Sequence, residues 1–82
     1  MQTIQVNQME LGLYKHYKGN MYEVIGIAKH SETLEEMVVY KATYQEEPNN
    51  IWVRPKAMFL EKIEINGNLI ERFSKISKDM ML

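Results

Sequence analysis

The sequence contains no cysteine, which excludes a disulfide framework and a thiolate metal site, so packing alone has to stabilise the domain. No apolar run approaches the 18 or more residues of a membrane span. The first ten residues lack the basic start and the apolar stretch of a signal peptide. We therefore expect a cytoplasmic protein that makes no use of a membrane.

Neither sign of charge dominates the chain, which has 10 basic and 11 acidic residues and a formal net charge of −1. No strong overall field therefore attracts a phosphate backbone, and nucleic acid is a possible but not a favoured partner. A chain of 82 residues forms one domain with one small core. Such a core leaves little stability for strained catalytic geometry, which weighs against an enzyme without excluding one.

Short segments of alternating or β-branched character, separated by turn residues, predict strands along most of the chain. These segments are residues 11–17, 21–30, 36–44 and 51–55, followed by two runs within 60–73. Gly26 inside the second segment indicates a bulge or a sharp bend. Asn66 and Gly67 favour a type I′ hairpin turn. The stretch "PKAMF" has room for one helical turn, which we interpret as a 3₁₀ turn.

This pattern predicts an all-β fold, a small SH3-like barrel or roll of five to six strands with one short 3₁₀ turn. We expect residues 1–10 to form an N-terminal lead-in, residues 11–73 the single β-barrel domain, and residues 74–82 a C-terminal tail. A fold of this kind does not by itself define a function.

The tripeptide "HSE" (His30, Ser31 and Glu32) holds every residue type of a hydrolytic triad, but in consecutive positions. Triads are normally assembled from distant segments, so a local turn, with Thr33 and Glu36 spaced as a capping box, is the favoured interpretation. His16 and His30 could also bind a metal ion together with Glu32. The two histidines are 14 residues apart, however, and the spacing does not specify a third ligand close to both. We assign no catalytic residue, no metal and no cofactor.

Trp52 and Arg54 in "WVRP" lie on one face of a strand, because alternate side chains of a strand point the same way. A large ring beside a bidentate cation is typical of binding sites. The structural alternative places Trp52 in the core and pairs Arg54 with Glu23, Glu32 or Glu61. The tyrosines leave a similar choice between core packing and a stacking wall for a base or a peptide. The five tyrosines are Tyr14, Tyr17, Tyr22, Tyr40 and Tyr44.

The chain resembles the bacterial family called domain of unknown function 1653. The similarity covers residues 11–73 and depends on "YKHYKGNMYEVIGIAKHSETLEEMVVYKATY" and "WVRPKAMFLEKIEINGNLIERF". The resemblance implies a small module, found alone or attached to other domains, and supplies no activity. The connector "QEEPNN" before Trp52 departs from the family pattern. The family's recurrent residues correspond here to His16, Lys18, Tyr22, His30, Ser31, Glu32, Tyr40, Trp52 and Arg54.

The leading hypothesis is a non-enzymatic binding module for a small anionic ligand, a nucleotide fragment or a peptide, in which the "HSE" turn meets the Trp52–Arg54 pair. One alternative is a small hydrolase or nucleotide-processing enzyme that uses His30 and Glu32. Another is single-stranded nucleic acid binding. We expect the partner to be an unknown small ligand or protein, and the chain to be a monomer or a weak dimer. The candidate ligand-binding residues are His16, Tyr22, His30, Ser31, Glu32, Tyr40, Trp52 and Arg54.

Overall fold

A computed structural model describes residues 9–76 of the chain, so most of the predicted N-terminal lead-in and C-terminal tail lies outside the described residues. The elements are β1 (Gly12–His16), β2 (Met21–Lys29), β3 (Glu36–Ala42), β4 (Ile51–Pro55), α1 (Lys56–Phe59), β5 (Lys62–Ile65), β6 (Asn68–Glu71) and β7 (Phe73–Lys75). The all-β class is confirmed. The one helix within residues 9–76 has four residues and is too short to cross a membrane.

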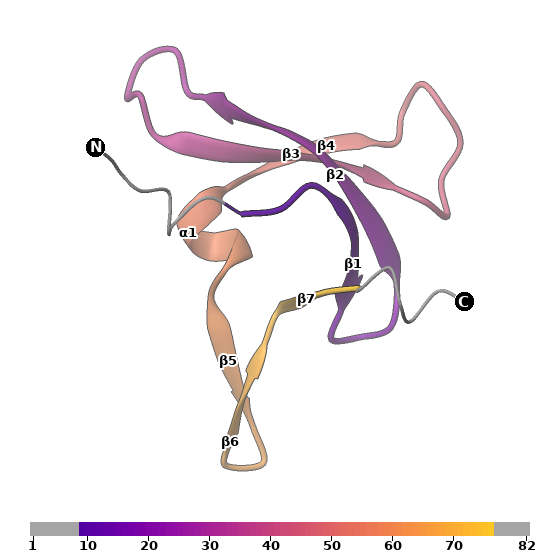
Figure 1. The fold of residues 1–82 in the computed structure, drawn as a ribbon, viewed down its shortest axis with the longest axis vertical. Helices are drawn as coiled ribbons and strands as arrows, with labels where there is room; N and C mark the ends of the chain where they lie inside the picture. Colours follow the sequence, from indigo (N-terminus) through magenta and orange to yellow (C-terminus); the bar gives the residue numbers. More distant parts are fainter. Residues whose placement is uncertain (1–8, 77–82) are drawn as a thin grey trace.

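The strands form an antiparallel five-stranded sheet, in the order β4-β3-β2-β1-β7, and a separate hairpin of β5 and β6 (Figure 1). The hairpin extends away from the larger sheet. Within the described residues β4 and β7 end the sheet on opposite sides and do not pair, so the strands do not close into the predicted barrel. A seventh strand is present because β7 pairs with β1, and it includes Ser74 and Lys75, which the sequence placed in the tail.

The "PKAMF" segment forms one turn of α-helix, so the predicted 3₁₀ turn is wrong. The backbone N–H of Leu60 donates to the carbonyl of Lys56, four residues earlier, at 3.0 Å. The N–H of Glu61 then bonds to Met58 three residues back, at 3.3 Å. Tightening of this kind is common at helix ends, where pattern reading cannot separate the two helix types.

Gly26 lies at a bulge in β2, as its position in an apolar strand predicted. The pairing of β2 with β3 shifts between Val24, which faces Tyr40, and Gly26, which faces Val39. Ile27 then faces Val38. The extra residue therefore brings Val24 and Ile27 to one face of the sheet, whereas strict alternation would place them on opposite faces.

The core is a cluster of aromatic rings on one face of the five-stranded sheet. Phe59 from α1 is fully buried and stacks on Phe73 from β7, with ring centroids 4.0 Å apart and planes 6° apart. Tyr14 and Tyr40 each meet the Phe59 ring edge-on at 5.4 Å. The short helix is therefore anchored over the sheet by one side chain.

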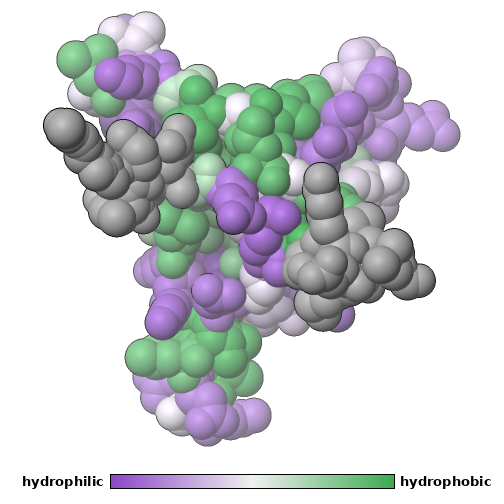
Figure 2. Space-filling model, in the orientation of Figure 1, coloured by the Kyte–Doolittle hydropathy of each residue, from purple (hydrophilic) through white to green (hydrophobic). Residues whose placement is uncertain are grey.

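The β5–β6 hairpin turns at Asn66 and Gly67, which have φ angles of 52° and 83°. Positive φ at both positions is the requirement of the predicted type I′ turn. The hairpin carries exposed apolar side chains, and Figure 2 shows apolar surface both on it and over the region where β2, β3 and β4 cross. The two-residue turn thus sets the register in which β5 and β6 pair.

Gly67→Ala is expected to lower the free energy of unfolding by about 1 kcal/mol, because an L side chain is strained at this φ. A Cβ built on Gly67 meets no atom within 4 Å, so the cost is conformational and not steric. Urea unfolding measures the change, with Asn68→Ala in the adjoining strand as the control. Equal stability of the two variants would contradict this account of the turn.

Candidate functional site

The pairing of β2, β3 and β4 gathers aromatic and basic side chains on one face of the sheet. Trp52 faces Tyr40, and Arg54 faces Val38 on the same strand pair. Directly opposed residues share a face, so Trp52, Tyr40 and Arg54 point to the same side, as alternation in "WVRP" predicted. Tyr22 joins them from β2, where it pairs with Ala42.

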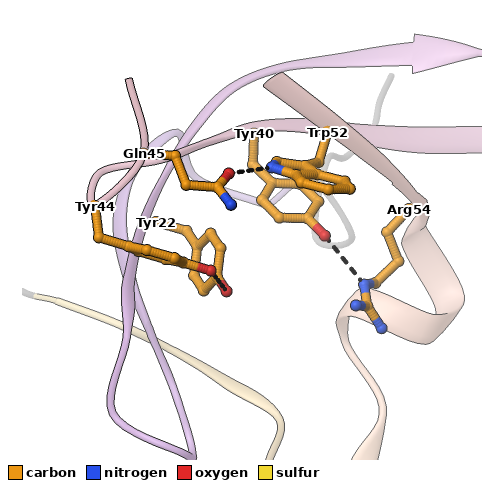
Figure 3. A pocket seen from close by; sticks show the side chains of 6 residues that line it. All are labelled: Tyr22, Tyr40, Tyr44, Gln45, Trp52 and Arg54. Atoms are coloured by element: carbon orange, nitrogen blue, oxygen red, sulfur yellow. Dashed lines mark hydrogen bonds between the residues drawn. The ribbon is translucent and has the colours of Figure 1, made fainter. Parts of the chain in front are cut away.

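These side chains surround a cavity of about 280 Å³ (Figure 3). The size is near the lower end of the range for small-molecule sites and suits a ligand of one ring and a few polar groups. Trp52 and Tyr44 keep 48% and 53% of their surface exposed, so large rings border an accessible opening. The lining residues are Tyr22, Tyr40, Tyr44, Gln45, Trp52 and Arg54.

Two hydrogen bonds hold the rings of this cavity in place. The indole Nε1 of Trp52 donates to Oε1 of Gln45 at 2.9 Å, and the hydroxyls of Tyr22 and Tyr44 lie 2.7 Å apart (Figure 3). Tyr44 and Gln45 follow β3, in the connection to β4. Sequence reasoning missed Gln45 because it lies in a polar connector. The one signal for such a residue is that the indole N–H of Trp52 needs a hydrogen-bond acceptor.

Arg54 forms no ion pair with a carboxylate among residues 9–76. Its Nε donates to the hydroxyl of Tyr40 at 3.3 Å, and its guanidinium lies 5.6 Å from the Phe73 ring centroid. The predicted alternative of a carboxylate partner is not found, and Glu61 pairs instead with Arg72 at 3.1 Å. Arg54 therefore presents a positive charge beside the cavity with no acid of the described chain to neutralise it.

The Tyr22 hydroxyl of the cavity stays protonated at neutral pH. Burial, followed by the hydrogen bond and charge of Tyr44, raises the pKa of Tyr22 from 10.0 to about 12. A neutral hydroxyl both donates and accepts hydrogen bonds. The Tyr22 hydroxyl therefore adds hydrogen-bonding capacity to the cavity without adding negative charge that would repel an anion.

His16 lies beside the cavity but does not line it. Its ring meets Phe73 at 4.8 Å and Tyr22 at 6.3 Å, both edge-on. The Nδ1 atom accepts the backbone N–H of Lys18 at 3.1 Å, which requires this nitrogen to be unprotonated. Burial lowers the pKa of His16 below its ordinary 6.5, and the charge of Arg54 lowers it further.

The midpoint of the His16 titration is expected to rise in Arg54→Ala. This substitution removes the positive charge that, among those near the ring, lowers the pKa of His16 the most. NMR of the ring protons measures the midpoint, and Lys62→Ala on the hairpin is the control. A depressed histidine pKa also means that the unfolded chain binds the proton more readily. The free energy of unfolding should therefore fall as pH is lowered from about 6.5. An unchanged midpoint in Arg54→Ala would show that Arg54 does not act on this ring.

The "HSE" segment lies in the turn between β2 and β3 and is not part of the cavity lining. The Nδ1 atom of His30 accepts the backbone N–H of Glu32 at 3.1 Å, and Thr33 Oγ1 accepts that of Glu35 at 3.1 Å. No helix follows Thr33, so the capping box is wrong, and β3 begins at Glu36. The predicted meeting of this turn with Trp52 and Arg54 at the cavity is not found, because none of the residues of "HSE" is among those that line it.

Within residues 9–76 no three histidine and acidic side chains are grouped closely enough to hold a metal ion. Of the eight candidate ligand-binding residues, the structure brings four together around the cavity and places His16 next to them. The remaining three are in the β2–β3 turn. The four residues at the cavity are Tyr22, Tyr40, Trp52 and Arg54.

The family model for the protein of unknown function DUF1653 matches residues 12–75, so the chain belongs to this family. A crystal structure of a DUF1653 protein from Bordetella bronchiseptica is similar, with 28% sequence identity and a TM-score of 0.77. The similarity covers 88% of this chain and 92% of that one. No curated protein matches. The resemblance read from the sequence is confirmed, and the fold is shared with a member solved by experiment.

Proposed function

We propose that the protein is a non-enzymatic module that binds a small anion carrying a flat ring, with a nucleoside monophosphate as the model ligand. The observation that carries the proposal is the guanidinium of Arg54, which has no carboxylate partner among the described residues and borders a cavity walled by aromatic rings. A planar cation is suited to phosphate and carboxylate groups, which it can bind with two parallel hydrogen bonds.

The ring of such a ligand has a surface to stack on. Trp52 and Tyr44 each leave about half of their surface open to solvent, so a flat ligand that covers these rings removes apolar area from water. Stacking of one base on an aromatic side chain contributes about 1–3 kcal/mol. The hydrogen bonds of Trp52 to Gln45 and of Tyr22 to Tyr44 fix the rings before a ligand arrives, which reduces the entropy lost on binding.

Binding is favoured over catalysis because the cavity lining contains no carboxylate, imidazole or thiol. General acid–base chemistry most often uses such a group within hydrogen-bond reach of the substrate, and the raised pKa of the Tyr22 hydroxyl makes it a poor base at neutral pH. The hydrolase alternative through His30 and Glu32 would have to act in the exposed β2–β3 turn, where His30 Nδ1 already accepts backbone N–H groups. Nucleic acid binding uses the same stacking surface, and a steep salt dependence with affinity rising with strand length would favour it.

The test is a titration of the full chain, followed by the fluorescence of Trp52, which is the single tryptophan. The probes are adenosine and uridine monophosphates, the matching nucleosides, inorganic phosphate and a short acidic peptide. A saturable change with the monophosphates is expected, with nucleosides and phosphate each binding about tenfold more weakly, a difference of about 1.4 kcal/mol. Binding of the peptide alone would change the ligand class, and no response to any probe would overturn the proposal.

A further inference from the structure

The outer edge of β4 has the features of an unused strand-pairing surface. β4 ends the five-stranded sheet, and no strand within residues 9–76 pairs with its outer side. Ile51, Trp52 and Val53 are apolar and are 47%, 48% and 60% exposed. Edge strands normally carry charged residues, bulges or a covering element that prevent pairing with another chain. Residues 51–53 carry no charge and pair with β3 in continuous register.

The backbone groups of Ile51 and Val53 point outward from this edge. The N–H of Ala42 donates to the carbonyl of Asn50 at 2.8 Å, which sets the phase of the β3–β4 ladder. Hydrogen-bonded pairs alternate in antiparallel strands, so Trp52 and Arg54 use their backbone groups toward β3. Ile51 and Val53 therefore offer two N–H donors and two carbonyl acceptors to an added strand.

We propose that a second copy of this chain pairs with β4, antiparallel and about a two-fold axis at Trp52. In this register Ile51 exchanges both backbone hydrogen bonds with Val53 of the second copy, and Val53 does the same with Ile51. All four outward donors of the two strands are then satisfied. The two Trp52 residues face each other at the non-hydrogen-bonded position, where opposed side chains come closest.

The position of Pro55 selects this register over its neighbour. Centring the axis on Val53 would place Pro55 of the second copy opposite Ile51, and proline has no N–H to give to the Ile51 carbonyl. Centring it on Trp52 leaves Pro55 outside the shared ladder. Aromatic pairs also attract each other beyond the area that they bury, which further favours opposed Trp52 rings.

The surface chemistry fits a second copy of the same chain. Residues 49–53 are uncharged, so two antiparallel copies bring no like charges together at the edge. The formal net charge of −1 produces little repulsion between whole molecules. β-branched Ile51 and Val53 are suited to cross-strand contact with each other. Only three residues of each strand take part, which indicates a weak dimer.

Sedimentation equilibrium of the full chain, without ligand, tests the association. The wild type is expected to dimerise reversibly as its concentration is raised, and Val53→Lys to weaken dimerisation at least about tenfold, since lysine on an edge strand opposes pairing. Leu69→Lys is the matched control, because Leu69 on the hairpin is 70% exposed and also apolar. A monomer at every concentration, or equal effects of the two substitutions, would overturn the proposal.

The absence of cysteine allows the register to be tested by single substitutions. Trp52→Cys is expected to form an intermolecular disulfide, because opposed residues at this position lie within the Cα separation that a disulfide spans. A mixture of Ile51→Cys and Val53→Cys chains should form the mixed disulfide at least about tenfold faster than Val53→Cys alone. Preferred cross-linking of Val53→Cys with itself would overturn the register. These experiments contain no ligand, so they succeed or fail independently of the proposed binding function.

Discussion

Phe59→Ala is expected to lower the free energy of unfolding by about 3–5 kcal/mol, the largest effect of any single truncation in this core. Phe59 is fully buried and is the one buried residue of α1. It stacks on Phe73 and meets Tyr14 and Tyr40 edge-on, so its loss empties the centre of the ring cluster. For a domain whose total stability is of the order of 5–15 kcal/mol, this is a large fraction.

The measurement is chemical unfolding followed by far-UV circular dichroism. Met58→Ala is the matched control, because Met58 precedes Phe59 on the same helical turn but is 46% exposed. It should lower stability by less than about 1 kcal/mol. Phe59→Leu should recover part of the loss, since it refills most of the cavity with apolar volume. A difference of less than about 1 kcal/mol between Phe59→Ala and Met58→Ala would show that the ring cluster is not the centre of stability.

Arg54→Ala is expected to weaken binding of a nucleoside monophosphate by about ten- to a hundredfold, since hydrogen bonds to charged groups contribute about 1.5–3 kcal/mol. Binding of the uncharged nucleoside should change far less. Arg54→Lys should recover only part of the affinity, because a point charge cannot reproduce two parallel hydrogen bonds. This pattern separates recognition of the anion by the guanidinium from a general electrostatic attraction.

Two controls make the Arg54 result specific. Lys62→Ala removes the same charge from β5, outside the cavity lining, and should leave the affinity unchanged. Arg54 also contacts Tyr40 and Phe73, so thermal unfolding of each variant is measured in parallel. Equal losses for the monophosphate and the nucleoside would indicate that Arg54 shapes the cavity and does not bind the anion.

The sequence predicted the strands well because their signals are local. The β-branched run in β3, the Gly26 bulge and the Asn66–Gly67 turn each depend on a few neighbouring residues. Closure into a barrel depends on pairing between strands that are distant along the chain, and no local pattern reports it. β7 was missed for a related reason, since its pairing with β1 defines a three-residue strand that has no alternation of its own.

Four of the eight residues proposed from the sequence line the cavity, and two of them follow from a rule that concerns one strand at a time. Alternation correctly placed Trp52 and Arg54 on one face, and pairing with β3 then added Tyr40. The proposed contribution of His30 required the β2–β3 turn to fold back over the cavity, and residue types alone do not report such long-range geometry. Gln45 was missed because its role depends on reaching one indole N–H across a loop.

The separate pairing of β5 with β6 has a consequence for the dynamics of the molecule. This two-stranded sheet is hydrogen-bonded within itself and shares no ladder with the larger sheet. Isolated two-stranded sheets are only marginally stable in water, and regions with few buried contacts open locally at a lower free energy than the whole domain. We therefore expect the amides of β5 and β6 to exchange with deuterium by opening of this unit alone, and those of β2 and β3 to exchange more slowly, through opening of the larger sheet.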